Sequence, residues 1–457
     1  MSATDSTTEQ LLRVVAFYLP QFHPVPENDA WWGSGFTEWT NVVRARPRFP
    51  DHYQPHLPTE LGFYDLRVPE VREQQAALAR AYGIEAFCYY HYWFNGRGVL
   101  DRVFREVLRS GRPDFPFCLC WANENWTRHW DAGNGDILIA QDYDEEDDLN
   151  HIRYLIDAFR DPRYLTVDGR PLLMLYRVQK LPQPRRTFDL WRKECAAADV
   201  PEPLIVKFET HGNFDDPADY GCDMAAQFLP HGVGENVPMA NVSGCHPGNA
   251  VFDYERVVDT FVEQSSPPWV RVPSVFPAWD NSPRRKDGEA LIFVNNSPAA
   301  FERWLRGADG LAREQGQRLV FVNAWNEWAE GAHLEPDERD GRAFLDAISR
   351  VVHGDVPSDP DALLPGPPRE TLAPSTFADL YLELYADYRK LQRSTTDLMA
   401  SMERRIRLAA DERDRLLRAS REQAAQLAEW GRRLEAELDI ARRQLGARGA
   451  ELSPVSP

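Results

Sequence analysis

Short apolar runs recur along the first three quarters of the chain, and stretches with helical character separate most of them. Most of the runs are too short for helices, and they cover residues 14–22, 84–94, 115–126, 171–176, 203–208, 224–229, 272–279 and 319–328. Such runs are typical of parallel strands that are buried on both faces. The helical stretches include residues 69–82, 149–159, 187–198 and 298–315. This alternation predicts an α/β fold, a (β/α)8 TIM-like barrel. An open doubly wound sheet is the alternative, but no GxGxxG or GxxxxGKS/T turn follows the first run.

The composition changes after residue 352, where a proline-rich segment begins. Proline-rich segments of this kind act as linkers between folded parts. We therefore expect a disordered N-terminus at residues 1–11, a barrel domain at 12–353, a linker at 354–374, a helical tail at 375–446 and a disordered C-terminus at 447–457. Two insertions, residues 24–61 and 232–248, follow the first and sixth strands, and in a barrel both lie on the face that carries the active site.

The predicted tail has no proline, and its only glycine before the terminal Gly446 is Gly431. Apolar residues recur at the a and d positions of a heptad: Tyr381, Leu384, Tyr388, Leu391 and Leu398, and later Leu427, Trp430, Leu434, Leu438 and Leu445. This pattern predicts a coiled-coil-like helix that self-associates or binds a partner protein. A solvated, charged helix is the alternative.

The overall charge and the cysteines restrict the functional class. The 457 residues carry a net charge of −19, which argues against a sequence-independent nucleic-acid binder, because such proteins need a basic surface. The six cysteines have no zinc-like CxxC pairs. No secretion signal and no run of 18 apolar residues is visible. These features predict a cytoplasmic protein with reduced thiols and no transmembrane segment.

The last predicted strand ends in an unusual sequence, WNEWAEGAHLEP. Glu327 and Glu330 are three residues apart, so on a helical turn both carboxylates face one side. Two carboxylates at one site tend to separate in pKa, leaving one as an acid and the other as a base or nucleophile, and this division of labour is typical of glycoside cleavage. Four neighbours are candidates for substrate contacts: Trp325, Asn326, Trp328 and Glu335. The alternative is the ordinary charge of a solvated loop.

Other predicted strands also end in polar and aromatic residues. Tryptophan faces suit the C–H surfaces of sugar rings, and amides and charges suit hydroxyl groups. The further candidates for substrate contacts are Tyr18, Gln21, His23, Glu38, Trp39, Tyr90, His91, Tyr92, Trp121, Asn123, Glu124, Trp126, Arg128, Trp279, Asp280 and Asn281. For each, a structural role is the alternative, and for His91 this is a core histidine. No metal-like His/Asp spacing and no GxSxG motif is present, so we expect neither metal nor cofactor.

Several motifs in the same order resemble one protein family. They are AFYLPQFHP, WWGSGFTEWTNV, CWANENWTRHWD, PAWDNSPR and WNEWAEGAHLEP, and the likeness covers residues 12–352. They are similar to the WbsX-type family of polysaccharide-biosynthesis proteins, also described as glycoside hydrolase family 99-like. Members are found among genes for O-antigen and other cell-surface glycans. The related hydrolases are (β/α)8 endo-α-mannosidases, and they commonly carry histidine where this chain has Ala329.

The resemblance implies a retaining, substrate-assisted reaction on an oligo- or polysaccharide. It implies that Glu330 is the general acid/base at the glycosidic oxygen and that Glu327 takes the proton of the substrate's own 2-hydroxyl. Two alternatives are a glycosyltransferase that uses a nucleotide sugar and a non-catalytic glycan-binding protein. For the first, no DxD motif is present, and the nearest phosphate-binding candidates are Arg284, Arg285 and Lys286.

Overall fold

The computed structural model of the protein describes residues 11–127 and 137–357, together with Glu429, Arg433, Leu438 and Ile440. The chain divides into two units, residues 1–365 and 366–457, and the sheet and helices described below lie in the first. Apart from residues 354–357, the predicted linker lies outside the described residues, as does nearly all of the predicted tail, so both stay predictions. Among the described residues, no helix is long and apolar enough to cross a membrane.

Parallel strands form one large sheet that curves into a nearly closed barrel. In spatial order they are β12 (Arg271–Val272), β10 (Met224–Gln227), β9 (Leu204–Glu209), β8 (Arg170–Leu175), β4 (Phe117–Trp121), β2 (Ile84–Phe94), β1 (Arg13–Tyr18), β15 (Leu319–Val322) and β13 (Ser274–Val275). β12 pairs with β10 and β13 pairs with β15, and only Pro273 separates β12 from β13. Proline has no N–H to give to a ladder, which explains the break. Counted as one strand, β12 and β13 bring the two ends of the sheet together, and the architecture is TIM-like.

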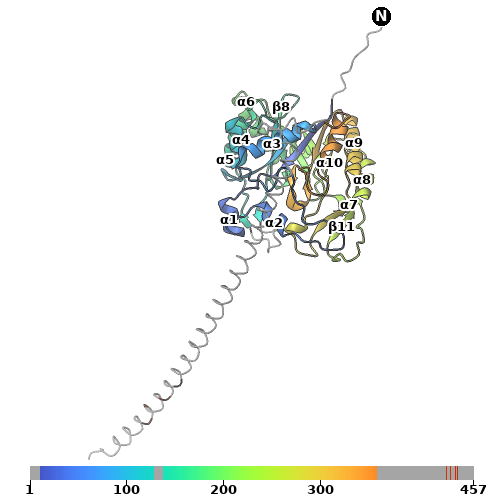
Figure 1. Ribbon diagram of the computed structural model, residues 1–457. Helices are drawn as coiled ribbons and strands as arrows, with labels where there is room; N and C mark the ends of the chain where they lie inside the picture. Colours follow the sequence, from blue (N-terminus) through green and yellow to red (C-terminus); the bar gives the residue numbers. More distant parts are fainter. Residues whose placement is uncertain are drawn as a thin grey trace, which may run out of the picture. The chain divides into compact units, whose positions relative to one another are not determined.

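Helices follow most of the strands, as the sequence predicts. They are α1 (Pro26–Trp32), α2 (Glu38–Arg44), α3 (Pro69–Ala81), α4 (Arg102–Ser110), α5 (Glu145–Phe159), α6 (Pro184–Ala197), α7 (Val233–Asn236), α8 (Tyr254–Val262), α9 (Pro298–Glu314) and α10 (Ala343–Val352). Figure 1 shows α3, α4, α5 and α6 along one side of the sheet and α8, α9 and α10 along the other. α1 and α2 lie in the first predicted insertion and α7 in the second. Both insertions, with the neighbouring β11, lie at the lower end of the unit in Figure 1.

Short elements connect the main ones at the strand ends. Two short strands pair with barrel strands: β3 (Arg97–Val99) with β2 and β7 (Thr166–Val167) with β8. Other short strands pair with each other: β5 (Trp126–Thr127) with β6 (Ile137–Ile139), and β11 (Ala250–Asp253) with β14 (Leu291–Val294). The 3-10 helices are η2 (Val178–Lys180), η3 (Pro217–Tyr220), η4 (Ser282–Arg284) and η5 (Trp328–Glu330). After β15, β16 (Asn326–Glu327) pairs antiparallel with β17 (Ala332–His333) on either side of η5.

Aromatic side chains fill the barrel interior. The ring of Phe17 on β1 lies 5.3 Å from that of Phe321 on β15, 5.8 Å from that of Tyr90 on β2 and 5.4 Å from that of Phe208 on β9. These contacts join strands that are far apart in the sequence, because inward-facing residues of a barrel pack in common layers. The core therefore supports the strand ends that carry the polar residues.

The predicted strand ends were wrong by four or more residues at four positions. β1 stops at Tyr18 rather than at Phe22, β4 stops at Trp121 rather than at Trp126, β13 stops at Val275 rather than at Trp279, and β15 stops at Val322 rather than at Trp328. Most residues that follow these strands are still buried, so burial rather than strand pairing produces the apolar pattern.

Candidate active site

Arg284 lies at the centre of a buried charge cluster beyond the carboxyl ends of the strands. It ends η4, in the loop after β13, and its side chain contacts carboxylates from two other loops. The Nη2 atom lies 2.9 Å from Oε2 of Glu38 and 3.1 Å from Oε2 of Glu327, and the Nη1 atom lies 2.8 Å from Oε1 of Glu330. The side chain of Arg284 is only 3 % exposed and that of Glu330 is 17 % exposed. One guanidinium thus bridges three carboxylates, and Glu330 has the most access to solvent.

Three carboxylates against one guanidinium leave an excess of negative charge in a buried place. Burial raises the pKa of Glu327 to about 8, and the charges of Glu330 and Glu38 add to this effect while Arg284 opposes it. Burial also raises the pKa of Glu330, again against the attraction of Arg284. Because the two glutamates are coupled, the cluster retains a proton near neutral pH. It therefore holds a proton donor and a proton acceptor side by side.

The backbone after β15 brings Glu327 and Glu330 to the same side. η5 has the three-residue turn of a 3-10 helix, so residues three apart overlie one another. Gly331 ends η5 with φ of +62°, and a Cβ on it would lie 3.0 Å from the backbone nitrogen of Asp280. That nitrogen donates to the carbonyl of Glu330 at 2.6 Å. A residue larger than glycine would push these two loops apart.

Asn326 fixes the loop after β15 to the end of the first strand. Its Oδ1 accepts from the backbone N–H of Leu19 at 2.7 Å, and its Nδ2 donates to the carbonyl of Leu19 at 3.0 Å. Asn123, after β4, holds Arg177 in the same way, with distances of 2.8 and 2.9 Å. Both amides are fully buried and bind backbone groups of the neighbouring strand. We predicted both for substrate contacts, and their placement gives them a positioning role.

Glu335 lies in a buried hydrogen-bond network rather than at a surface. Its carboxylate accepts from Nε1 of Trp328 and from Nε2 of Gln75, each at 2.6 Å, and from the hydroxyl of Tyr64 at 2.8 Å. Burial raises the pKa of Glu335 to about 7, although these donors favour the ionised form. Tyr18, another predicted contact, joins the same network by donating to Gln75 at 2.7 Å. The network supports η5 from the interior.

Several predicted stacking tryptophans have almost no exposed face. Trp325, Trp328 and Trp121 are 0 %, 1 % and 1 % exposed. The ring of Trp328 stacks on that of His333, with centroids 3.8 Å apart. The ring of Trp39 lies 5.5 Å from that of Trp328, and its Nε1 donates to the carbonyl of Tyr64. These placements do not fit the expected role of Trp328 as a platform for a sugar ring. The aromatic faces of these tryptophans pack in the core. The sequence pattern alone could not distinguish core tryptophans from tryptophans that contact a ligand.

At the end of β2, alternate side chains face the barrel interior and the surrounding helices. Tyr90 and Tyr92 face the charge cluster: after burial, the charge of Glu327 is the largest influence raising their pKa values, and Gln21 is hydrogen-bonded to Tyr92. His91 faces the other way, with its Nε2 3.0 Å from that of His151 on α5. Burial lowers the pKa of His91 to about 3, so it is a neutral core histidine. This is the alternation expected from the strand period.

The remaining candidates lie around the barrel mouth. Glu124 forms a 2.8 Å ion pair with Arg177, and Trp126 packs against Tyr92, with ring centroids 5.0 Å apart. Asp280 accepts from His52 at 2.7 Å and from Gln54 at 2.5 Å, and these bonds lower its pKa. Three others are buried or fixed to backbone: burial lowers the pKa of His23 to about 4, Trp279 is buried, and Asn281 accepts from the N–H of Leu291. Arg128 lies outside the described residues.

The comparison with protein-family models decides the family. The model described as glycosyltransferase WbsX matches residues 14–348, which is most of the chain. The chain belongs to the WbsX glycosyltransferase family.

Curated relatives of this WbsX-family chain are also found. One is the uncharacterized protein WxcX of Xanthomonas campestris pv. campestris strain B100, which is 44 % identical over 344 residues, covering 74 % of this chain and 49 % of the relative. The same protein from strain ATCC 33913 is equally similar. The chain therefore spans about half the length of the curated relatives that it matches.

Solved structures with a related fold are more distant. A glycoside hydrolase-like protein is 13 % identical, with 77 % of this chain and 97 % of that chain covered and a TM-score of 0.49. The family 99 endo-α-mannosidase of Bacteroides thetaiotaomicron is also 13 % identical, with 74 % and 96 % covered and a TM-score of 0.44. These likenesses are too distant to assign an activity to the WbsX-family chain.

Sequence reasoning missed the centre of the WbsX-family site. It considered Arg284 only as a phosphate ligand, whereas the guanidinium is enclosed by three carboxylates. It did not select Tyr176, at the end of β8, whose pKa is raised by burial and by the charges of Glu124 and Glu330. The signal for Arg284 was its place directly after the predicted seventh strand, where barrel enzymes carry functional residues.

A group of possible metal ligands lies behind the charge cluster. His56, His333 and Asp337 are buried and place ligand atoms within 4.8 Å of one another. His333 Nδ1 lies 3.0 Å from the carbonyl of Glu335, to which it donates, so its Nε2 is the acceptor for His56 Nδ1 at 2.9 Å. These hydrogen bonds are enough to hold the three side chains together. The three residues have no role in the reaction that we propose.

Proposed function

We propose that this protein cleaves or transfers a glycosyl unit, such as an α-mannosyl unit, in the biosynthesis of a cell-surface polysaccharide of the O-antigen or lipopolysaccharide type. The bridging of Glu327 and Glu330 by Arg284 is the observation that carries the proposal. A coupled carboxylate pair at the carboxyl ends of barrel strands is the arrangement that glycoside chemistry requires. Membership of the WbsX glycosyltransferase family supports a carbohydrate substrate.

The proposed reaction has two steps and ends with retention at the anomeric carbon. In the first, Glu330 gives its proton to the glycosidic oxygen, the bond from C1 to that oxygen breaks, and the substrate's O2 bonds to C1 while its proton passes to Glu327. In the second, the hydroxyl of an acceptor or of water attacks C1 and gives its proton to Glu330. The bond from O2 to C1 breaks as the new bond forms, and Glu327 returns the proton to O2. Both glutamates finish in their starting states.

This scheme requires the shared proton to be on Glu330 when the bond breaks. In the protein without substrate, the pKa of Glu327 is raised to about 8, so the proton resides on Glu327 for part of the time at neutral pH. A substrate 2-hydroxyl that donates to ionised Glu327 would favour the ionised form. Substrate binding then transfers the proton within the pair. Tyr90, Tyr92 and Tyr176 adjoin the pair, and we propose that they contact the sugar.

Transfer to an acceptor hydroxyl and hydrolysis by water differ only in the second step. The description of the WbsX family as glycosyltransferases favours transfer. A nucleotide-sugar donor is less well supported, because the guanidinium of Arg284, our nearest phosphate candidate, is already bridged to three carboxylates. A glycan-binding protein without catalysis would not need a proton-sharing pair in a buried site. The scheme uses neither metal nor organic cofactor.

The regions outside the barrel have proposed roles of their own. We propose that residues 354–374 are a linker and that residues 375–446 form a helix that self-associates or binds a partner protein. A cytoplasmic location stays a prediction. Deleting residues 375–457 should change the number of subunits, calculated from the mass measured by light scattering, and leave turnover of a small substrate unchanged. A monomer both before and after the deletion would exclude self-association.

The proposed function is tested by a substrate screen read by mass spectrometry. Manno-configured oligosaccharides and nucleotide sugars are incubated with the full chain, with and without EDTA. We expect a product from the oligosaccharides that EDTA does not suppress. Glu327→Gln and Glu330→Gln should each reduce turnover by on the order of 10²-fold or more, the contribution typical of a general acid or base.

A nearby exposed carboxylate supplies the control for these variants. Glu338 lies in the same loop and is exposed, so Glu338→Gln should keep wild-type turnover. Wild-type rates in both Glu327→Gln and Glu330→Gln would refute the roles of the pair. A product formed only from nucleotide sugars would instead favour a glycosyltransferase that uses a nucleotide-sugar donor.

A further inference from the structure

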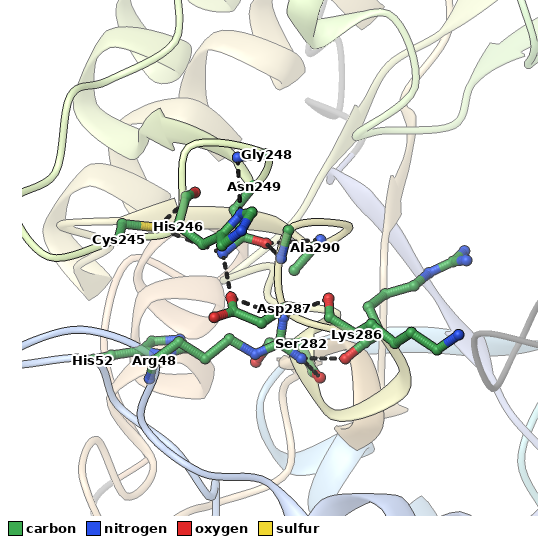
Figure 2. Close-up of polar contacts among 12 residues, drawn as sticks. Arg48, His52, Cys245, His246, Gly248, Asn249, Ser282, Lys286, Asp287 and Ala290 are labelled. Atoms are coloured by element: carbon green, nitrogen blue, oxygen red, sulfur yellow. Dashed lines mark hydrogen bonds and ion pairs between the residues drawn. The ribbon is translucent and has the colours of Figure 1, made fainter.

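The turn that carries Arg284 is held from both sides by other loops. Figure 2 shows this turn, with Ser282, Lys286 and Asp287, between Arg48 on one side and Asn249 on the other. Arg48 follows α2 in the insertion after β1, and Asn249 precedes β11 in the loop after β10. The position of Arg284 therefore depends on residues that do not touch the carboxylates.

Arg48 binds the backbone of the turn through its guanidinium. Its Nη1 donates to the carbonyl of Lys286 at 2.9 Å, and its Nη2 donates to the carbonyl of Ser282 at 2.5 Å and to that of Arg285. The three carbonyls surround Arg284 in the sequence, and one planar group binds all of them. Asp287 lies 3.8 Å from the same guanidinium and balances part of its charge. Guanidinium is suited to this role because it presents several donors in a fixed plane.

Arg48 also contacts the segment behind Glu330. Its backbone N–H donates to Nδ1 of His52 at 3.0 Å, so the proton of this imidazole is on Nε2, which donates to Asp280 at 2.7 Å. The N–H of Asp280 in turn donates to the carbonyl of Glu330 at 2.6 Å. One residue is thus linked both to the turn of Arg284 and to the backbone of Glu330.

Asn249 fixes the other half of the turn. Its Oδ1 accepts from the N–H of Gly288 at 2.8 Å and from that of Ala290 at 3.1 Å, and its Nδ2 donates to Asp287 at 2.9 Å. Figure 2 shows these contacts above the contacts of Arg48. With one end held by Asn249, the loss of Arg48 would free the end that carries Arg284.

We propose that Arg48 is a positioning residue of this site, which holds the turn of residues 282–286 so that the guanidinium of Arg284 lies among Glu38, Glu327 and Glu330. The proposal rests on the proposed function for its kinetic consequences and on the contacts alone for its electrostatic ones. If the turn relaxes, the carboxylates lose the nearest positive charge and hold their shared proton more tightly. The groups that face Glu327 and Glu330 are Glu38, Arg284, Arg285, Tyr90, Tyr92 and Tyr176.

The kinetic test compares Arg48→Met with Arg46→Met over a range of pH. Arg46 lies two residues away in the same loop, is exposed, and donates to the carbonyls of Val43 and Ala45 in its own loop, so it is a matched control. We expect Arg48→Met to lower kcat at least 10-fold with little change in KM. In the pH–rate profile, the limb that reports loss of the shared proton should move to higher pH. Arg48→Lys, which keeps the charge and one donor group, should restore part of the rate.

A second test does not need a substrate. Melting temperatures of the two full-length variants are measured between pH 6 and pH 9. If Arg48 acts through Arg284, ionising the glutamates costs more in Arg48→Met, and the gap in melting temperature between the two variants should widen as the pH rises. A constant gap, or a pH–rate profile identical to that of Arg46→Met, would overturn the proposal. Absence of any glycosyl activity combined with a widening gap would refute the proposed function and keep the role of Arg48.

Discussion

The guanidinium of Arg284 lies 3.1 Å from the carboxylate of Glu327, although the residues belong to loops that follow different strands. This contact, with that to Glu330, opposes the burial that raises the pKa of both glutamates. The arginine therefore controls how readily the pair gives up its proton.

Replacing Arg284 tests this relationship directly. Arg284→Met should reduce turnover more than Arg284→Lys, because lysine keeps the positive charge but cannot bridge three carboxylates. The pH–rate profile of both variants should move to higher pH, since the glutamates ionise less readily without the guanidinium. Steady-state kinetics from pH 5 to pH 9 measures both effects, and an unshifted profile in Arg284→Met would contradict the assignment.

The raised pKa of Glu327 also makes a prediction for stability. Its pKa rises from 4.5 to about 8 on folding, so the folded state binds more protons than the unfolded state between these values. The corresponding stability is fully present below pH 4.5 and is lost as the pH rises to about 8. Glu327→Gln removes this loss, so its melting temperature relative to wild type should increase from pH 5 to pH 9.

Other groups titrate over the same range, and a control separates them. Glu335, with its pKa raised to about 7, contributes a loss of the same sign in both proteins, and only the difference between variants is informative. Glu338→Gln changes an exposed carboxylate in the same loop and should follow wild type at every pH. A flat difference between Glu327→Gln and wild type would show that Glu327 ionises normally.

Asn326 should matter more for stability than for substrate binding. Asn326→Ala leaves the N–H and the carbonyl of Leu19 buried without these partners, and each such group costs about 1–3 kcal/mol. Denaturant unfolding of Asn326→Ala against Asn241→Ala, an exposed position, measures the cost. An equal free energy of unfolding in the two variants would instead indicate that Asn326 contacts the substrate.

Trp328 gives a different result from the one its sequence suggests. Because it is 1 % exposed and stacks on His333, Trp328→Ala should lower the free energy of unfolding by about 3–5 kcal/mol. Binding of a glycan to the fraction that remains folded should then change little. Unfolding measured by fluorescence or circular dichroism, with calorimetric binding, separates the two effects, and a large loss of affinity at unchanged stability would identify a platform.

The sequence contained enough information for the strand order but not for the roles of individual side chains. All eight apolar runs contain barrel strands, because burial on both faces leaves a period that is easy to recognise. Asn123 and Asn326 looked like sugar ligands because their residue type suits hydroxyl groups. Their backbone partners, Arg177 and Leu19, are 54 and 307 residues away in the chain and cannot be inferred from local pattern. Arg284 was underrated for the same reason.

The pairing of β1 with β15 has a consequence for synthesis of the protein. The first strand of the barrel is made before the others, yet the strand that pairs with one of its edges is among the last parts of the barrel to be made. Leu19 and Asn326 are 307 residues apart, and Glu327 and Glu330 follow Asn326 directly. A nascent chain therefore has no complete site, and one edge of β1 is open to wrong pairing until translation has passed residue 330. Under the proposed function, a growing chain can become active only after the last strand of the barrel has paired with β1.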